Sequence, residues 1–162
     1  MHWEQYLGDA SYDELYETTC PQTICTPFGC TDYETPCIKS REWTAYFTLV
    51  VDYPDDVSDE QQAVIISCAI GAVAVAYATA VSVYTVEGPI YGAEVAALDA
   101  ANAAIVACRE TFELCISGLP SEIKDNIGIA VTHYVEQTFR PPIICIPTCY
   151  PICYNSSYKW YR

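Results

Sequence analysis

Basic side chains are scarce in this sequence. Its 162 residues include 7 Lys and Arg against 21 Asp and Glu, which gives a formal net charge of −14 at pH 7. Nucleic acids and anionic membrane surfaces are bound through clustered Lys and Arg. We therefore expect neither as a partner. The negative charge should also hold copies of the chain apart unless low pH, salt or cations neutralise it.

Catalytic and cofactor-binding motifs are lacking as well. The sequence contains no P-loop, no G-x-G-x-x-G, no H-E-x-x-H, no G-x-S-x-G and no C-x-x-C-H. Outside the extreme N-terminus the only histidine is His133, and no motif surrounds it. We expect a protein that is not an enzyme and that uses no cofactor.

Charge of either sign is absent from Gln61 to Val86, a stretch of Ala, Val and Ile with scattered Ser, Thr, Cys and Tyr. As a helix it would be roughly 40 Å long. A helix that is apolar on all sides must be covered by protein or by lipid. One small domain cannot surround such a helix, so we expect partners or a membrane.

The apolar pattern predicts an α+β fold. A capping box at Ser58 and Gln61 starts a helix over about 59–86, and Glu87-Gly88-Pro89 ends it. A second, one-sided helix with an alanine stripe follows over about 90–117. Together they form a long antiparallel Ala-rich helical hairpin with a short turn.

A small sheet should pack with the helices. Residues 43–53 alternate apolar and polar side chains up to Pro54 and predict a strand. Residues 127–139 fit either a helix or a strand. Their β-branched residues and Gly128 favour a strand that pairs with the first.

The two ends of the chain differ from its centre. Residues 1–42 form a Cys-rich N-terminal arm, in which 12–17 fit a short helix and 19–42 a loop with turn signals at its prolines. Residues 43–140 are the core. Residues 141–162 are too rich in proline for a helix and predict an extended Cys/Pro/Tyr-rich arm. We interpret the whole as one domain.

Cysteine, in contrast, is abundant. The ten residues are Cys20, Cys25, Cys30, Cys37, Cys68, Cys108, Cys115, Cys145, Cys149 and Cys153. Their number predicts disulfides in an oxidising setting. Zinc sites, the rival interpretation, usually pair their cysteines more closely. Disulfides favour an extracellular, cell-surface or spore-surface protein. Since no signal-peptide pattern is visible at the start of the sequence, the alternative expectation is a cytoplasmic inclusion that later meets oxidant.

The helical hairpin predicts one cysteine pair. With a turn near 88–89, facing residues have numbers that add up to about 177. Cys68 then lies beside Cys108, and we expect the two in contact, with a disulfide as the bond this contact would allow. Cys115 would be left for a cysteine of the arms.

Acidic residues cluster before the first helix. A calcium ion is a candidate ligand, although the order of an EF-hand loop is missing. The alternative is a helix N-terminus that carries acids at the positive end of its dipole. The residues are Asp52, Asp55, Asp56, Asp59 and Glu60.

Aromatic residues crowd both arms. Tyr and Trp are enriched at protein interfaces, so these side chains are candidates for clasping neighbouring copies; alternatively they fold back on their own sheet. They are Trp3, Tyr6, Tyr12, Tyr16, Tyr150, Tyr154, Tyr158, Trp160 and Tyr161.

These features favour a structural protein that assembles with copies of itself. Disulfides would stabilise the polymer, which could be a filament, a coat, a sheath or a crystalline inclusion. Two alternatives stay open. One is a membrane-active pore former that inserts the helical hairpin; the other is a monomeric, secreted, disulfide-rich binding module.

Overall fold

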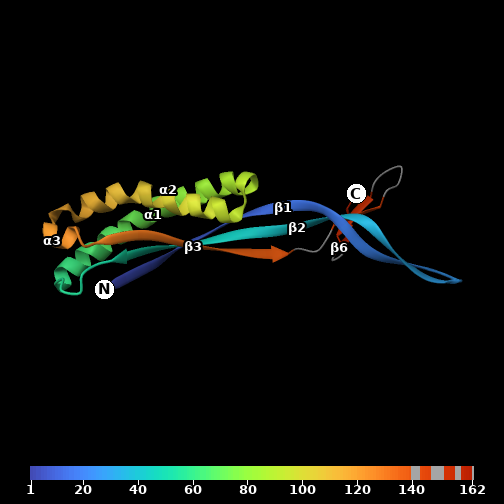
Figure 1. The fold of residues 1–162 in the computed structure, drawn as a ribbon, viewed down its shortest axis with the longest axis horizontal. Helices are drawn as coiled ribbons and strands as arrows, with labels where there is room; N and C mark the ends of the chain where they lie inside the picture. Colours follow the sequence, from blue (N-terminus) through green and yellow to red (C-terminus); the bar gives the residue numbers. More distant parts are fainter. Residues whose placement is uncertain (140–142, 147–151, 156–157, 162) are drawn as a thin grey trace. The chain divides into compact units, whose positions relative to one another are not determined.

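A computed structural model describes residues 1–139 and the backbone of three short strands that follow them (Figure 1). Contacts divide the chain into two compact units. Unit 1 is Met1–Tyr12 with Thr44–Glu136, and unit 2 is Asp13–Trp43 with Gln137–Arg162. The elements are β1 (His2–Thr26), β2 (Gly29–Asp52), α1 (Asp59–Tyr91), α2 (Ala93–Cys115), η1 (Ile116–Gly118), α3 (Ser121–Lys124), β3 (Gly128–Phe139), β4 (Ile143–Ile146), β5 (Ile152–Asn155) and β6 (Tyr158–Tyr161).

Unit 1 has the expected α+β architecture. Its antiparallel sheet places β2 between β1 and β3, and the long helices α1 and α2 pack together on one face of the sheet (Figure 1). Both expected strands are confirmed, the first as the end of the longer β2 and the second as β3.

The core lies between this sheet and the helices. The residues of β2 that the alternation assigns to one face, Ala45, Phe47, Leu49 and Val51, are fully buried. The helices meet them largely with alanine, which lets the layers approach closely. Buried residues on the helix side include Ile65, Ala69, Ala72, Ala76, Ala80, Tyr84, Ala96, Ala97, Ala100, Ala104 and Phe112.

Helix α1 begins as expected and ends later than expected. The capping box is present, since Ser58 Oγ accepts from Gln61 N at 3.2 Å and Gln61 Oε1 accepts from Ser58 N at 2.9 Å. The predicted end at 87–89 is wrong, because α1 runs through Pro89 to Tyr91. Pro89 lacks the N–H that would donate to the Thr85 carbonyl, and the helix continues past it for two residues to Tyr91. The chain leaves the helix at Gly92, whose φ of 91° suits glycine.

The later turn changes the cysteine pairing. Cys68 is bonded to Cys115, and Cys108 is a free, buried thiol. The expected disulfide between Cys68 and Cys108 is therefore wrong, as is the expectation that Cys115 pairs with a cysteine of the arms. With the turn at Gly92, facing residues have numbers that add up to about 184 rather than about 177. That shift of two helical turns moves the partner of Cys68 from position 108 to position 115.

Tyrosines and glycines join β1 to α1. Gly8, with a φ of 141°, leaves room for the ring of Tyr77, whose hydroxyl donates to the Asp9 carbonyl at 3.0 Å. In the opposite sense, Gly88 of the helix leaves room for the ring of Tyr12 from the strand. The absence of a side chain at these two positions lets strand and helix approach each other closely.

Unit 2 is a sheet rather than a loop. The expected helix at 12–17 and loop at 19–42 are wrong, because both segments belong to β1 and β2, which turn at Pro27-Phe28. Along this part of β1 the exposure alternates residue by residue, as in a strand with one covered face. Two cross-strand disulfides, Cys20–Cys37 and Cys25–Cys30, fix the pairing.

The later strands extend the sheet of unit 2. β4 pairs antiparallel with β2 through Cys37 opposite Ile144, β5 pairs with β4, and β6 pairs with β5. The described residues of the expected C-terminal arm thus have the extended conformation that was predicted for it.

Candidate functional site

One side of α1 is left uncovered. Buried positions recur along the side that faces the sheet and α2, and the opposite side is exposed throughout. We call this the outer face of α1. It consists of Ala63, Val64, Ser67, Ile70, Gly71, Ala74, Val75, Ala78, Ser82, Thr85 and Val86.

The outer face of α1 has no charge and much apolar area. Ile70 is 58% exposed and Val86 is 63% exposed. Helix α2 also exposes apolar side chains, but these stand among charged ones such as Glu94, Arg109 and Glu113. Exposed apolar surface of this extent usually marks an interaction site.

A membrane is one environment that would suit such a helix. Among the described residues, α1 is the one helix long and apolar enough to cross a bilayer. Core helices of soluble proteins meet the same criterion. Length and composition therefore do not decide between protein and lipid.

A second uncharged surface lies in unit 2. The Cys25–Cys30 disulfide closes the turn between β1 and β2, and Phe28 within this turn is 100% exposed. We call residues 25–30 the Phe28 loop. The sequence carries no charge from Thr18 to Thr31. The sequence signals for the loop were a turn motif and two flanking cysteines, and its role as a surface was not predicted.

The cysteines are mostly paired. Three disulfides join six of the seven cysteines in residues 1–139, which is compatible with an oxidising environment. Burial raises the pKa of the remaining thiol, Cys108. In the β4–β5 ladder Cys145 stands opposite Cys153. Cys149 lies outside the described residues.

The aromatic candidates for clasping neighbours separate into groups. Tyr12 packs inside unit 1, at 5.6 Å from Tyr84 between ring centroids, and Tyr16 lies under the Arg41 guanidinium at 4.8 Å. Trp3 is partly exposed, whereas Tyr6 is exposed. Tyr12 and Tyr16 therefore make contacts within their own chain. The candidates beyond residue 139 fall outside the described side chains: Tyr150, Tyr154, Tyr158, Trp160 and Tyr161.

The acidic residues before α1 do not converge on a metal position. Within the described residues no group of three or more His, Cys, Asp or Glu is placed to hold an ion. Asp52 instead accepts from His2 Nδ1 at 2.8 Å, and Asp55 pairs with the Met1 amino group. The hydrogen bond to Asp52 raises the pKa of His2. The calcium candidate is therefore not supported by this arrangement, and Asp59 and Glu60 occupy the first turn of α1.

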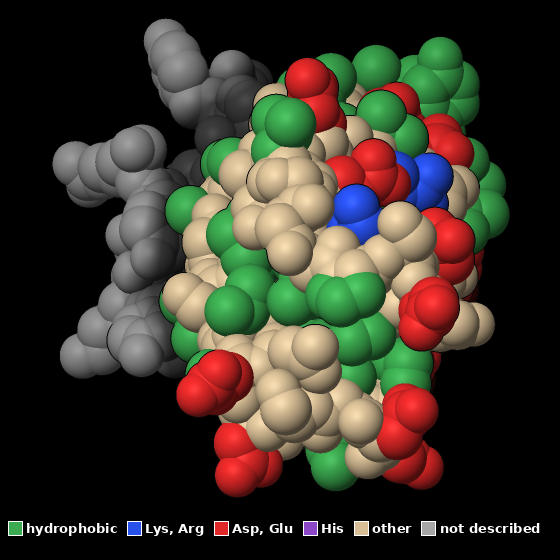
Figure 2. Space-filling view, turned by 90° about the vertical axis from the view of Figure 1, so that its left-hand side faces the viewer, with side chains coloured by type: hydrophobic (Ala, Val, Ile, Leu, Met, Phe, Trp, Pro, Cys, Tyr) green, Lys and Arg blue, Asp and Glu red, His purple; other side chains and the backbone are tan. Residues whose placement is uncertain are grey.

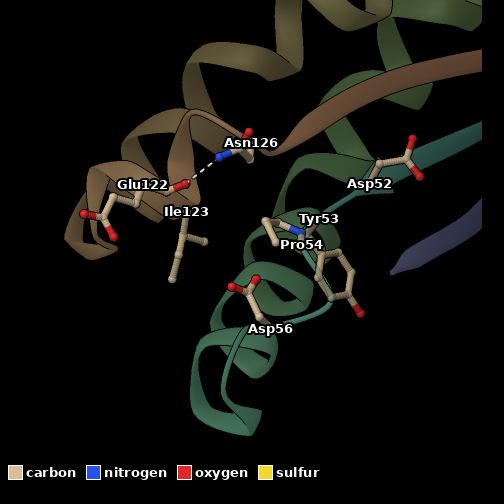
Figure 3. A pocket seen from close by; sticks show the side chains of 7 residues that line it. All are labelled: Asp52, Tyr53, Pro54, Asp56, Glu122, Ile123 and Asn126. Carbon is tan, nitrogen blue, oxygen red and sulfur yellow. Dashed lines mark hydrogen bonds between the residues drawn. The ribbon is translucent and has the colours of Figure 1, made fainter.

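A cavity of about 650 Å³ opens beside these residues. Figure 3 shows Tyr53, Pro54 and Ile123 on its walls with three carboxylates around them. Asn126 donates from Nδ2 to the Glu122 carbonyl at 2.7 Å. With three carboxylates in its lining, the cavity would suit a small cation or amine better than an anion.

The sheet face away from the helices carries a tyrosine pair. Tyr46 and Tyr134 stack at 4.6 Å with an interplanar angle of 15°. The Tyr46 hydroxyl donates to Glu136 Oε2 at 2.9 Å, and this bond raises the pKa of Tyr46 to about 12. The phenol therefore stays protonated at neutral pH and acts as a cross-strand tie.

Comparison with protein-family models, curated proteins and solved structures finds no match.

Proposed function

We propose that the protein is a non-enzymatic structural protein that assembles with copies of itself into a disulfide-stabilised polymer. The observation that carries the proposal is the outer face of α1, which is exposed, apolar and uncharged on a chain with a net charge of −14. The assembly would be extracellular, on a cell or spore surface, or a stored inclusion that meets oxidant later.

Electrostatics supports copies of the chain meeting at this face. Figure 2 shows one side of the chain, where acidic side chains lie at several separate places and basic ones occupy a small area. Two such surfaces repel each other. An uncharged face avoids this repulsion and releases water from apolar surface when it is covered.

The size of the face sets a limit. The outer face runs from Ala63 to Val86 and is about 36 Å long. A contact strip about 10 Å wide would bury roughly 360 Å² on each partner, well below the roughly 800 Å² of a standard stable interface. The face alone therefore supports a weak pair, and a stable polymer needs many copies or added contacts.

The test is particle size in the absence of detergent, by sedimentation and light scattering. We expect large particles from the wild type and dispersal by Ile70→Asp, which places a charge on the outer face. Val106→Asp is the matched control, because Val106 is at least as exposed on α2 (74% against 58% for Ile70) but stands among charged residues. A wild type that stays monomeric would contradict the proposal and favour a binding module.

One observation favours a second function. Because α1 has the length and composition of a membrane span, a pore former remains the alternative. It predicts dye release from liposomes by the wild type and none by Ile70→Asp, with no particles in the absence of lipid. Its weakness is the composition of α1, in which alanine, glycine, serine and threonine contribute little to insertion.

A further inference from the structure

The Phe28 loop is cross-linked, although the side chain of Phe28 itself makes no contact within the chain. The Cys25–Cys30 disulfide closes it, and Thr26 fastens it from within: its hydroxyl donates to the Gly29 carbonyl at 3.2 Å and accepts from Phe28 N at 3.3 Å. Single exposed apolar residues are common. Here the exposed ring stands on a pre-organised loop, and pre-organisation lowers the entropy that binding costs.

The strands beneath the loop are cross-linked as well. Thr23 donates to Asp32 Oδ1 at 2.7 Å and Thr19 donates to Glu34 Oε2 at 3.0 Å. These bonds engage the two carboxylates nearest to the loop on β2. The Phe28 loop and the residues beside it are therefore cross-linked and uncharged. Their exposed apolar side chains are Phe28 in the loop and Ile24 next to it.

The lack of charge on the Phe28 loop determines which kind of surface can bind it. An apolar ring gains from an apolar, uncharged acceptor, and a carboxylate buried beneath it would lose hydration without compensation. Among the described residues, the outer face of α1 offers such a surface over many turns. The two features are complementary in kind: one projects a ring, and the other presents an uncovered apolar strip.

We propose that the Phe28 loop of one copy packs on the outer face of α1 in a second copy. The inference rests on the self-assembly proposed above and names the segment that covers the helix. At the centre of the face, a β-carbon added to Gly71 would meet no atom within 4 Å. Small residues there, between branched ones such as Ile70 and Val75, leave space for a phenyl ring.

A contact between two different surfaces has a consequence for assembly. Each copy carries one loop and one helix face, so bonding one to the other leaves a free loop at one end and a free face at the other. Such heterologous contacts continue into open filaments unless the rotation closes a ring. One kind of contact thus covers both exposed surfaces and generates a polymer.

The first experiment is a photo-crosslink. Chain with benzoylphenylalanine in place of Phe28 is mixed with ¹⁵N-labelled wild type, assembled, irradiated and digested. We expect peptide pairs that join an unlabelled loop to a labelled segment from 59–91. Loop–helix pairs found only within unlabelled chains would overturn the proposal. So would crosslinks that form only to lipid when liposomes are added, which would assign the loop to a membrane.

The second experiment compares Phe28→Ser with Leu15→Ser. Leu15 is also exposed on β1, but acidic residues surround it. Phe28→Ser should raise the protein concentration needed for assembly at least about tenfold, and Leu15→Ser should change it less than about twofold. Both side chains are exposed, so the fold should survive; peptide mapping of Cys25–Cys30 verifies this.

The outcomes separate the two proposals. If the wild type never assembles, the proposed function fails and this inference fails with it. If the wild type and Phe28→Ser assemble at the same concentration and no loop–helix crosslink forms, this inference alone is overturned. Loss of assembly in Phe28→Ser together with intermolecular crosslinks to α1 supports both.

Discussion

The ring of Tyr12 in β1 occupies the space that a side chain on Gly88 in α1 would fill. A β-carbon at position 88 would lie 2.4 Å from a ring carbon. The same ring packs on Tyr84, which meets Phe47 of the sheet at 6.2 Å between centroids. One missing side chain in the helix therefore admits a strand aromatic into the core.

This contact predicts opposite effects for two Gly→Ala substitutions. Alanine favours a helix over glycine by about 1 kcal/mol. At Gly88 the overlap with Tyr12 should outweigh that gain and lower the free energy of unfolding by about 1–3 kcal/mol. At Gly71, where nothing lies within 4 Å, alanine should raise it by up to about 1 kcal/mol. Urea denaturation followed by circular dichroism compares the two; equal effects would contradict the contact.

The Cys68–Cys115 disulfide should be a main source of stability for the helical layer. It closes a sequence separation of 47 residues, for which chain entropy predicts about 4 kcal/mol. Cys115→Ser should therefore lower the free energy of unfolding by up to about that amount. Cys108→Ala removes a buried thiol without breaking a bond and should cost about 1 kcal/mol.

Peptide mapping provides the direct check on this pairing. It should recover a 68–115 disulfide and a free thiol at Cys108 that reacts with maleimide only after unfolding. A 68–108 disulfide would instead restore the pairing that the sequence alone suggested.

The regular elements could be predicted because their signals are local. The alternation of apolar and polar residues over 43–53 coincides with the strand that it predicts. The capping box of Ser58 and Gln61 lies at the start of the helix that it predicts. The end of α1 could not be predicted in this way, because Pro89 is a local helix breaker that tertiary packing tolerates. Because the turn was expected near 88–89 and lies at Gly92, the predicted partner of Cys68 was Cys108 instead of Cys115.

The candidate surfaces were predictable to different degrees. The lack of charge from 61 to 86 shows in the sequence, yet a helix that is apolar on all sides does not reveal which side is covered. The proline and threonine content of residues 19–42 is typical of a loop. The cross-strand disulfides that stabilise β1 and β2 there form only once the two strands pair across the turn. The exposure of Phe28 follows from that pairing and could not be anticipated.

A charged cluster in unit 2 should respond to acid. Arg41 donates to both Glu14 oxygens, at 2.8 and 3.0 Å, and Trp43 Nε1 donates to Glu14 Oε2 at 2.7 Å. The bonds from Arg41 and then Trp43 lower the pKa of Glu14. Their stabilisation is therefore present above the ordinary glutamate pKa and is lost as pH falls through the lowered value.

The fluorescence of Trp43 reports this titration in a chain with Trp3→Phe and Trp160→Phe. We expect a midpoint below the ordinary glutamate range. Arg41→Lys cannot form the two-pronged contact and should move the midpoint upward. Because both side chains are partly exposed, Arg41→Ala should lower the free energy of unfolding by less than about 1 kcal/mol. An unchanged midpoint in Arg41→Lys would contradict the arrangement.

The junction of α1 and α2 should respond to acid in the opposite direction. A side-chain hydrogen bond with Asp99 raises the pKa of Glu87. The Oε2 atom of Glu87 is buried and has no hydrogen-bond partner among the described residues. A raised pKa stabilises the fold below the ordinary glutamate pKa, and this contribution is lost as pH rises through the raised value. Glu87→Gln, which stays uncharged, should therefore raise the thermal midpoint at about pH 7 and make no difference at about pH 4. Glu113→Gln, on the exposed side of α2, removes the same net charge and serves as control; an equal gain from it at neutral pH would attribute the effect to net charge alone.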